Sequence, residues 1–409
     1  MIIGARYELN GRVAVVTLDN PPVNGLGHAT RAEVVAGLDR AIDDAGCDAI
    51  VITGAGGRFS GGADIREFNT PKASAEPTLH TLIRATDDCA KPVIAAIDGI
   101  CMGGGLELAL GCHYRVAGAR APLALPEVKL GLLPGAGGTQ RLPRAVGVET
   151  ALNMIVTGTS VTAATLKDTL LVDAVVEGNV LDAALTFART VVADGRPRKR
   201  LRDVAIDYPN ADAFFQFARN AIAATSRHYP APRKCIDAVA AAVAMPFDDG
   251  LRNERRLFLE LMQTPESRAL RHAFFAERAA TRIAGVADAT PVRRIERVAI
   301  VGAGTMGAGI AMNFLSAGFP VALLEMNAGA LERGVATIRA NYENAARRGR
   351  ITQDSITQTM TLLAPTLAYD DLRDAVGRDS SSLRRIFVIR ADRRHPTIER
   401  AGVHLEQCN

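Results

Sequence analysis

Residues 91–131 read KPVIAAIDGICMGGGLELALGCHYRVAGARAPLALPEVKLG, and the rest of the chain is organised around this stretch. Its residues 93–97 form a continuous apolar run of strand length. The glycines at 103–105 follow and open an apolar helix over residues 106–110. Glycine allows the backbone to approach a ligand closely, and a helix start leaves amide donors free. The stretch therefore predicts a strand–turn–helix junction that can contact a ligand.

Two glutamates lie in apolar surroundings beside this junction. Glu107 falls in the first turn of the expected helix, and Glu127 follows twenty positions later, directly after Pro126. Such a pair is a candidate general acid and base beside a candidate oxyanion site. The alternative is structural, with Glu107 stabilised by the helix dipole and Glu127 paired with a cation. Spacing alone leaves both interpretations open.

The motifs GGGLELALGCHYRVA (103–117) and LPEVKLGLLPGAGGTQRLPR (125–144) resemble the signature of the enoyl-CoA hydratase (crotonase) family. The resemblance is closest to its bifunctional enoyl-CoA hydratase/3-hydroxyacyl-CoA dehydrogenase members of fatty-acid β-oxidation. In that family two glutamates act on water and substrate, and they correspond to Glu107 and Glu127. The resemblance also implies an α/β fold, a crotonase-like spiral of ββα turns rather than a doubly wound sheet.

The segment FSGGADI, residues 59–65, is a second glycine-containing turn after an expected strand. From its residues alone, it either brings backbone amides near a ligand or makes a tight turn. The resemblance implies that the amides of Ala63 and Gly104 form the oxyanion hole. It also implies that Gly61, Asp64 and Ile65 lie along the adenine end of coenzyme A. Gly61 departs from the family pattern, in which alanine is usual.

Hydrophobic periodicity predicts further elements on either side. Residues 5–18 alternate as a strand, and Thr30 with Glu33 suggests a capping box at the start of a helix. Residues 162–188 are predicted to be helical, with the segment 171–176 between the helical parts. The repeated strand–turn–helix rhythm of residues 10–120 indicates βαβ units. The glycine-rich loop 131–140 lacks the Lys-Ser/Thr of a P-loop, and its role in the family is to shape the acyl pocket.

A basic run, residues 194–200, interrupts the pattern and is most simply a solvated linker. Residues 209–285 then show helical periodicity without a catalytic constellation. They resemble the helical region that joins the two enzymes in bifunctional relatives and ends in a helix packed on the hydratase domain.

A dinucleotide fingerprint follows, because residues 297–307, RVAIVGAGTMG, run from a strand into GxGxxG and a helix. A second strand, 321–324, ends at Glu325, which lies 23 residues after Gly302. This context predicts that the pyrophosphate binds at the helix start and that Glu325 binds the ribose hydroxyls, which favours NAD over NADP. The expected cofactor-binding residues are Gly302, Gly304, Thr305, Met306, Gly307 and Glu325.

The resemblance ends near residues 374–375, and an arginine-rich tail follows. We interpret the tail as out-of-register translation or a truncated gene and expect it to be disordered; the alternative is a genuine basic arm. His395 and His404 have no recognisable catalytic context. Only the first two strands of the nucleotide fold, 298–301 and 321–324, are expected, with residues 386–389 as a chance third strand. Weak NAD binding and no 3-hydroxyacyl-CoA dehydrogenase activity are therefore predicted.

The expected organisation has four parts. They are a hydratase domain (1–192), a helical linker region (193–295), a partial NAD-binding Rossmann domain (296–376) and an aberrant tail (377–409).

Composition limits the classes of partner. The net charge is +4 over 409 residues, without a block of like charge before the tail, so nucleic acid is an unexpected partner. The six cysteines form no CxxC or zinc spacing, which predicts reduced thiols and no metal site. The chain shows no signal peptide and no membrane-spanning apolar run, so a cytosolic location is expected.

The resemblance implies hydration of 2-trans-enoyl-CoA to 3-hydroxyacyl-CoA. A Δ3,Δ2-enoyl-CoA isomerase needs one such carboxylate, so the presence of both favours hydration. The remaining alternative is a catalytically silent protein that binds acyl-CoA or NAD. An acyl-CoA substrate is expected, and a homo-oligomer or a thiolase partner is left open.

Overall fold

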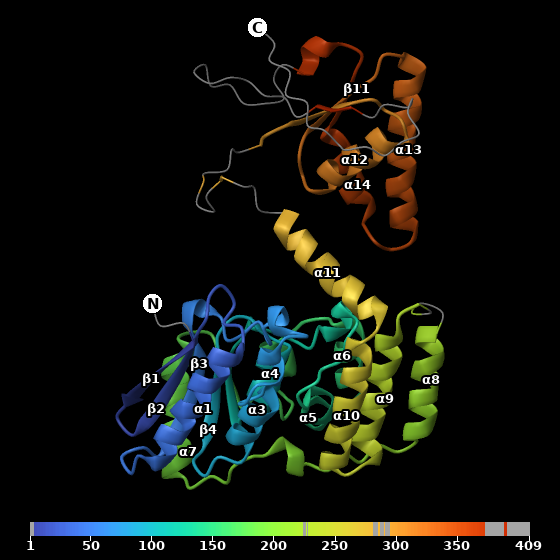
Figure 1. Cartoon of the computed structure of the whole chain (residues 1–409). Coiled ribbons are helices and arrows are strands. Elements are labelled where there is room, and N and C mark those ends of the chain that lie inside the picture. The colour runs from blue at the N-terminus through green and yellow to red at the C-terminus, as the bar shows by residue number, and fades with distance from the viewer. Residues whose placement is uncertain are drawn as a thin grey trace. The chain divides into compact units, whose positions relative to one another are not determined.

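The computed structural model describes residues 4–223, 226, 228–280, 285–286, 290, 295–372 and 388–390. The chain forms two compact units, Met1–Ala284 and Gly285–Asn409. Figure 1 shows their elements in chain order. The four-part division expected from the sequence stays a prediction. Most of the tail, including His395, His404 and Cys408, lies outside the described residues.

The N-terminal unit is built on a sheet with the order β1-β2-β3-β4-β6-β9. β1 pairs antiparallel with β2, and all the other neighbours are parallel. From β2 onward the order advances in one direction, so this sheet lacks the reversal of a doubly wound fold. Its strands are β1 (Gly4–Asn10), β2 (Val13–Asp19), β3 (Ala49–Gly54), β4 (Val93–Ile97), β6 (Tyr114–Gly118) and β9 (Ala174–Val176).

The single strand predicted over residues 5–18 is wrong, because this segment is a hairpin of β1 and β2. Gly11 has a φ of 61° between them, which lets the chain reverse.

A second, smaller sheet has the order β5-β7-β8. Its strands are β5 (Cys101–Met102), β7 (Pro122–Ala124) and β8 (Val161–Thr162). β4 leads into β5 and then into helix α4 (Gly104–Gly111), which makes one strand–strand–helix turn. β6 leads in the same way into β7 and the 3₁₀ helix η3 (Glu127–Leu130). The described residues therefore follow the expected ββα repeat.

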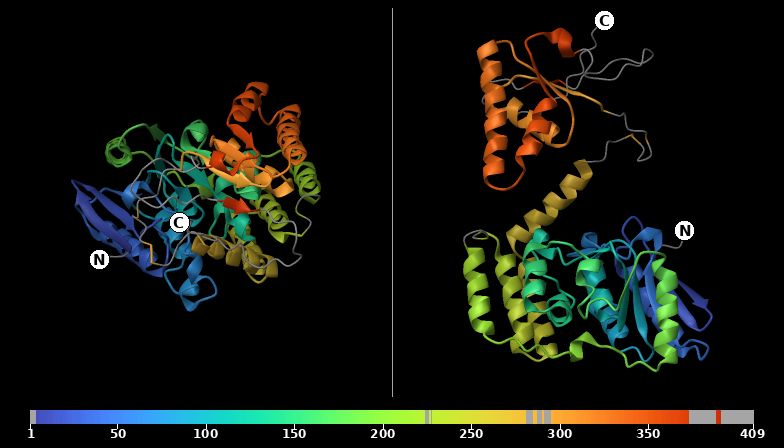
Figure 2. Two further views of the ribbon diagram at one scale, coloured as in Figure 1. Left: turned by 90° about the horizontal axis from the view of Figure 1, so that it is seen from above. Right: turned by 180° about the vertical axis from the view of Figure 1, so that it is seen from behind.

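Alternation along the strands creates two cores. Ala14, Val16 and Leu18 of β2 face the larger core, whereas Val13 and Val15 face a second core beneath helix α7. Figure 2 shows the sheet and its helices from two further sides. The helices before the linker are α1 (His28–Asp43), α2 (Pro71–Ser74), α3 (Leu79–Asp87), α4, α5 (Gly138–Val146), α6 (Val148–Thr157) and α7 (Val180–Ala193).

Two local predictions are wrong. Helix α1 begins at His28, so Thr30 lies inside its first turn and does not cap it, and the carboxylate of Glu33 accepts a hydrogen bond from the amide of Ala5 in β1. The helix predicted from residue 162 is also wrong, because this part contains only a 3₁₀ turn at Ala163–Leu166. The segment 171–176, left between the helical parts, contains β9, which pairs with β6 before α7 begins.

Four helices follow α7 in the N-terminal unit: α8 (Ala211–Ala223), α9 (Pro230–Ala244), α10 (Phe247–Met262) and α11 (Pro265–Ala280). Their buried side chains join the larger core, as Ile236 of α9 and Leu257 of α10 show. Three of these helices, α8 to α10, therefore bury apolar side chains in the same core as the sheet.

The basic run before these helices is not a solvated linker. Lys199 forms an ion pair with Asp173, and Arg200 pairs with Asp88 at 2.7 Å. Arg198 donates a hydrogen bond to the carbonyl of Cys89 at 2.7 Å. The cations hold this segment against the sheet domain because acidic and carbonyl groups face them.

The C-terminal unit contains a parallel sheet with the order β12-β11-β10-β13. The strands are β10 (Val298–Val301), β11 (Val321–Leu324), β12 (Leu363–Thr366) and β13 (Val388–Arg390), and the helices are α12 (Thr305–Ser316), α13 (Ala328–Arg347) and α14 (Gln353–Thr361). The chance third strand expected at residues 386–389 is confirmed in its place, because Val388–Arg390 pairs with the free side of β10. The expectation that β11 has no further neighbour is wrong, because Leu363–Thr366 pairs with it. Both additions satisfy backbone groups that a two-stranded sheet would leave unpaired.

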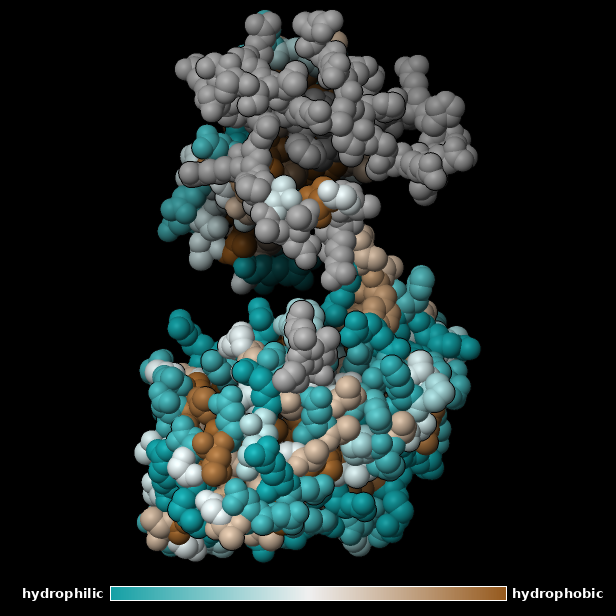
Figure 3. Space-filling model, turned by 60° about the vertical axis from the view of Figure 1, so that its left-hand side comes forward, coloured by the Kyte–Doolittle hydropathy of each residue, from teal (hydrophilic) through white to brown (hydrophobic). Residues whose placement is uncertain are grey.

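Within the described part of the chain, no helix is long and apolar enough to cross a membrane. On the face of the N-terminal unit seen in Figure 3, hydrophilic residues dominate and apolar residues form separate small patches. Five cysteines in this unit are free and buried: Cys47, Cys89, Cys101, Cys112 and Cys235.

A glycine substitution tests the close packing beneath α4. A Cβ atom on Gly105 would lie 2.7 Å from the Cβ of Ser60, whereas one on Gly178 meets nothing within 4 Å. We expect Gly105→Ala to lower the free energy of unfolding by about 1–3 kcal/mol through overpacking. Gly178→Ala should change it by less than about 0.5 kcal/mol. Urea unfolding of both variants checks this, and equal stability would contradict the packing.

Candidate active site and dinucleotide-binding turn

Two chain segments run parallel at the centre of the N-terminal site. The amide of Ser60 donates to the carbonyl of Ile100 at 3.0 Å, and the amide of Met102 donates to the carbonyl of Ser60 at 2.9 Å. This register pairs Ser60 with Cys101. Three residues further along each segment lie Ala63 and Gly104. The pairing therefore brings together the two residues predicted to form an oxyanion hole.

The amides of Ala63 and Gly104 are close and available. A Cβ atom on Gly104 would lie only 3.0 Å from the nitrogen of Ala63. Gly104 is the first residue of α4, so its N–H has no acceptor within the helix. Among the hydrogen bonds of the described residues, the N–H of Ala63 donates to no backbone acceptor outside regular elements. The role of both amides stays a prediction.

Glu107 is buried, and two backbone amides donate hydrogen bonds to its carboxyl group. Its side chain is buried in α4, and Oε1 accepts hydrogen bonds from the amides of Ala136, at 2.7 Å, and Gly138, at 2.9 Å. Burial raises the pKa of Glu107 above its ordinary value, and the two amides and the charge of Arg141 offset this rise only in part. The carboxylate thus lies at the N-terminus of α5, where the helix dipole favours a negative charge.

Glu127 is in a different environment at the start of η3. Its Oε2 is buried and has no hydrogen-bond partner among the described residues. A Cβ atom on Gly103 would lie 3.1 Å from Oε1 of Glu127, so the carboxyl group of Glu127 reaches the turn before α4. Burial, and then the charge of Glu107, raise the pKa of Glu127 well above its ordinary value. Both carboxyl groups have a raised pKa, but Glu107, which accepts two amide hydrogen bonds, ionises more readily, and Glu127 keeps its proton to higher pH.

The final helix of the unit holds the segment that carries Glu127. Ser267, in the first turn of α11, donates from Oγ to the carbonyl of Leu130 at 3.0 Å. Gly131 has a φ of 68° and would place a Cβ atom 2.9 Å from the Cα of Ser267. This close contact fixes η3 against α11.

A third buried glutamate was missed from the sequence. Glu254 of α10 is fully buried and accepts hydrogen bonds from the amides of Gly137, at 2.6 Å, and Thr139, at 3.0 Å. A signal was present: Gly250, Glu254, Leu257 and Leu261 share the spacing of one helix face and are all buried. A carboxylate on an otherwise apolar face indicates a buried partner.

The predicted coenzyme A segment follows Ala63. The amide of Gly61 donates to the carbonyl of Val23 at 2.7 Å. Asp64 caps the short 3₁₀ helix Ile65–Glu67 and binds the guanidinium of Arg66 at 2.8 and 2.9 Å. The hydrogen bond from Arg66 lowers the pKa of Asp64. Asp64 and Ile65 are half-buried, and Arg66 is exposed.

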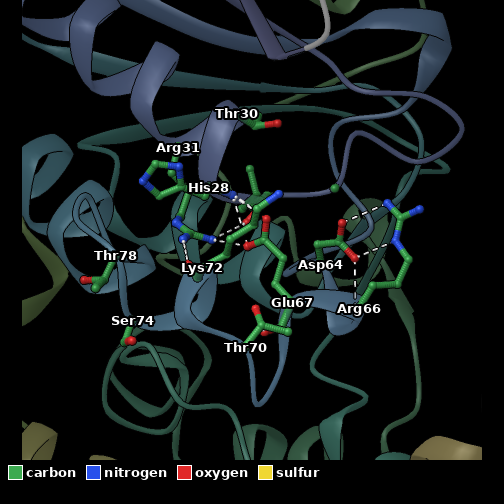
Figure 4. A network of polar contacts seen from close by, with 12 residues as sticks. His28, Thr30, Arg31, Asp64, Arg66, Glu67, Thr70, Lys72, Ser74 and Thr78 are labelled. Carbon is green, nitrogen blue, oxygen red and sulfur yellow. Dashed lines mark hydrogen bonds and ion pairs between the residues drawn. The ribbon is translucent and has the colours of Figure 1, made fainter.

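Arg31 anchors the loop after this segment (Figure 4). This buried guanidinium donates to the carbonyls of Leu26, Lys72 and Pro77 and pairs with Glu67 at 3.1 Å. Glu67 also accepts the amide of His28 at 2.9 Å. The loop is thereby tied to α1, which steadies the backbone around Asp64.

The predicted cofactor residues gather at one turn of the C-terminal unit. Gly302 has a φ of 99°, and Gly304 is the N-cap of α12. Thr305 and Met306 form the first turn of that helix. A Cβ atom on Gly307 would lie 1.7 Å from the carbonyl oxygen of Gly302, so only glycine permits this approach of helix and strand.

Glu325 completes the turn from the end of β11. Its Oε2 accepts a hydrogen bond from the amide of Ala303 at 3.0 Å, and Oε1 accepts one from the amide of Met326 at 2.8 Å. The acid predicted to bind ribose therefore lies beside the glycine turn predicted to bind pyrophosphate. The start of α12 follows a parallel strand and leaves the amides of its first turn without acceptors inside the helix, an arrangement that fits a dinucleotide.

Both units match known families. Residues 8–202 match the enoyl-CoA hydratase/isomerase family, and residues 297–378 match the NAD-binding domain of 3-hydroxyacyl-CoA dehydrogenase. The chain is 39% identical over 396 residues to the peroxisomal bifunctional enzyme of Danio rerio, which covers 94% of this chain and 54% of that protein. The identity to the human peroxisomal bifunctional enzyme is 40% over 349 residues, covering 83% of this chain and 48% of that protein. The chain thus spans about half the length of the curated relatives it matches.

A solved structure supports the fold of the N-terminal unit. The carnitinyl-CoA dehydratase of Mycobacterium avium 104 matches with a TM-score of 0.50 and 28% sequence identity. The match covers 67% of this chain and 97% of that one. The crotonase-like fold expected from the sequence is confirmed.

Glycine substitutions in α12 test the dinucleotide turn. Gly307→Ala should lower the affinity for NAD at least about tenfold, because its methyl group would displace Gly302. A Cβ atom on Gly309, in the same helix, would meet nothing within 4 Å, so Gly309→Ala is the matched control. Calorimetric titration of both variants with NAD checks this. Equal affinities would show that the turn does not hold the cofactor.

Proposed function

We propose that the chain, whose residues 8–202 match the enoyl-CoA hydratase/isomerase family, is a member of that family and hydrates 2-trans-enoyl-CoA to 3-hydroxyacyl-CoA in fatty-acid β-oxidation. The single observation that carries the proposal is the pair of glutamates in unlike environments. Two amides favour the carboxylate form of Glu107, whereas burial without a donor to Oε2 favours the neutral form of Glu127. Hydration needs one group that takes a proton and one that gives it.

The first part of the mechanism is polarisation of the thioester. The amides of Ala63 and Gly104 receive the thioester oxygen and stabilise the enolate-like charge that develops when water adds to the β-carbon. Each donor of this kind contributes about 3 kcal/mol to transition-state stabilisation. The close approach of Ala63 and Gly104 supports a shared acceptor between them.

The second part is proton transfer. Glu107 takes a proton from water, so the hydroxyl oxygen bonds to the β-carbon while the double-bond electrons move toward the thioester. Glu127 then gives its proton to the α-carbon and becomes a carboxylate. One proton leaves water and another reaches the substrate, which balances the addition of H₂O. A Δ3,Δ2-enoyl-CoA isomerase uses one carboxylate, so the intact pair favours hydration over isomerisation and over a silent binding protein.

The proposal assigns a part to each region. Residues 1–192 form the hydratase domain, with Gly61, Asp64 and Ile65 along the coenzyme A, and residues 193–295 supply the helices that complete it. Residues 296–376 bind NAD, which accepts a hydride when bound. Gly302, Gly304 and Gly307 would admit the pyrophosphate to the start of α12, beside Thr305 and Met306, and Glu325 would bind the ribose.

The compartment and the partners remain predictions. A cytosolic location is expected from the sequence, whereas the relatives described above are named as peroxisomal enzymes. An acyl-CoA is the proposed substrate, and a homo-oligomer or a thiolase partner is untested.

Substitution of each glutamate tests the proposed function. Glu107→Gln and Glu127→Gln should each lower the turnover of crotonyl-CoA by about 10²–10⁴-fold, the usual contribution of a general acid or base. Loss of enoyl absorbance measures the rate, and circular dichroism verifies folding. Hydration left intact in folded Glu127→Gln would refute the paired mechanism.

The dehydrogenase half has its own test. We predict that this chain forms no NADH from 3-hydroxybutyryl-CoA and NAD, because the histidines that follow Gly302 in the sequence, His395 and His404, have no recognisable catalytic context. NADH absorbance measures the product, and a full-length bifunctional relative serves as the positive control. Turnover that persists after contaminating dehydrogenases are removed would show that the prediction is wrong.

A further inference from the structure

Glu254 shares one loop with the proposed general base. Glu107 accepts hydrogen bonds from the amides of Ala136 and Gly138, and Glu254 accepts hydrogen bonds from the amides of Gly137 and Thr139. Successive amides therefore point alternately to two carboxyl groups, so the loop is clamped between them. Glu254 also accepts the hydroxyl of Thr139 at 2.6 Å.

The clamp joins elements that lie far apart in the sequence. Glu107 belongs to α4, the loop leads into α5, and Glu254 belongs to α10, which packs against α5 (Figure 1). Gly137 has a φ of 101°, a conformation that favours glycine and turns its amide toward Glu254. A shift of α10 would move the Gly137 and Thr139 amides, and the intervening Gly138 amide would move away from Glu107.

Burying a carboxyl group is costly unless its oxygen atoms are satisfied. The donors at Glu254 are two amides and one hydroxyl, all uncharged. An apolar side chain would suffice if α10 served only to fill the core. The placement of an acid there is explained by its hold on the loop beside Glu107.

We propose that Glu254 is a positioning residue for the hydration reaction: from α10 it fixes the Gly137 and Thr139 amides, so that the alternate amides hold Glu107 as the base. This inference rests on the proposed function. It makes the hydratase site depend on the helical segment that sequence analysis assigned to a linker.

Glu254 also contributes charge to the site. Burial and the charge of Glu107 raise the pKa of Glu254 to about 8. When ionised, Glu254 in turn raises the pKa of Glu127. Other titratable or charged groups facing this cluster are His80 of α3, Arg141 of α5, Cys235 of α9 and Arg255 of α10.

The titratable neighbours do not obscure the titration of Glu254. The pKa of His80 is lowered to about 4 by burial and by Arg255 and Arg141, and burial raises the pKa of Cys235 far above the neutral range. A neutral residue at position 254 should therefore lower the pKa of Glu127. Since hydration needs protonated Glu127, the high-pH limb of activity should move to lower pH.

The test compares Glu254→Gln with Glu260→Gln in the full chain, using crotonyl-CoA. Glu260 lies on the same helix but is exposed and pairs with Lys234, so its variant should behave as wild type. In Glu254→Gln the side-chain NH₂ group would face one of the backbone N–H donors of the loop. That donor would lose its acceptor, and part of the loop would no longer be held. We expect kcat to fall about 10²-fold, as for misplaced catalytic groups. KM should stay within about threefold of the wild-type value. The pH at which activity falls on the alkaline side should be lower by about half a pH unit.

A second variant keeps the inference testable if Glu254→Gln does not fold. Thr139→Val removes one donor to Glu254 and retains the amide and the side-chain shape, so kcat should fall about tenfold. A folded Glu254→Gln variant with the kcat and the pH profile of the wild type would overturn this inference and leave the proposed function intact. A raised KM with unchanged kcat would also overturn it, because the residue would then act on binding. No hydration by the wild-type chain would overturn the proposed function together with this inference.

Discussion

The parallel contact between residues 60–63 and 101–104 is the constraint on which the N-terminal site depends. Two backbone hydrogen bonds, at 3.0 and 2.9 Å, fix its register. The second requirement is the absence of Cβ atoms, because side chains on Gly104 and Gly105 would collide with Leu79 and Ser60 at 2.8 and 2.7 Å. With both conditions met, α4 begins beside Ala63 and carries Glu107 one turn further into the core.

The helices after the sheet domain support each glutamate by a different contact. Helix α10 reaches the loop that holds Glu107 through Glu254, and α11 reaches the segment of Glu127 through Ser267. Both contacts are polar and directed at backbone groups, whereas the surrounding core is apolar. Apolar packing sets the distance between the helices and the sheet, and these hydrogen bonds set the local register. A buried site assembled this way can keep one carboxyl ionised and its neighbour protonated.

Local sequence signals were sufficient where a residue's role depends on its immediate neighbours. The glycine turns at 103–105 and 302–307 and the strand 93–97 were predicted correctly because backbone sterics determine them. The predicted capping box failed because α1 begins at His28, and Glu33 has a tertiary partner in β1. Glu254 was missed because its partners are more than 100 positions away. Residues 363–366 carry a Pro at 365, which lacks an N–H and disfavours a strand interior, so only the neighbouring strand β11 identifies them as a strand.

The most direct test of the two-glutamate site is a crystal structure of the chain with a saturated acyl-CoA that cannot be hydrated. We predict that the thioester oxygen lies about 3 Å from the amide nitrogens of both Ala63 and Gly104. We also predict that the α- and β-carbons lie between the carboxyl groups of Glu107 and Glu127. A thioester bound elsewhere, or with its oxygen directed away from these amides, would contradict the proposed two-glutamate mechanism.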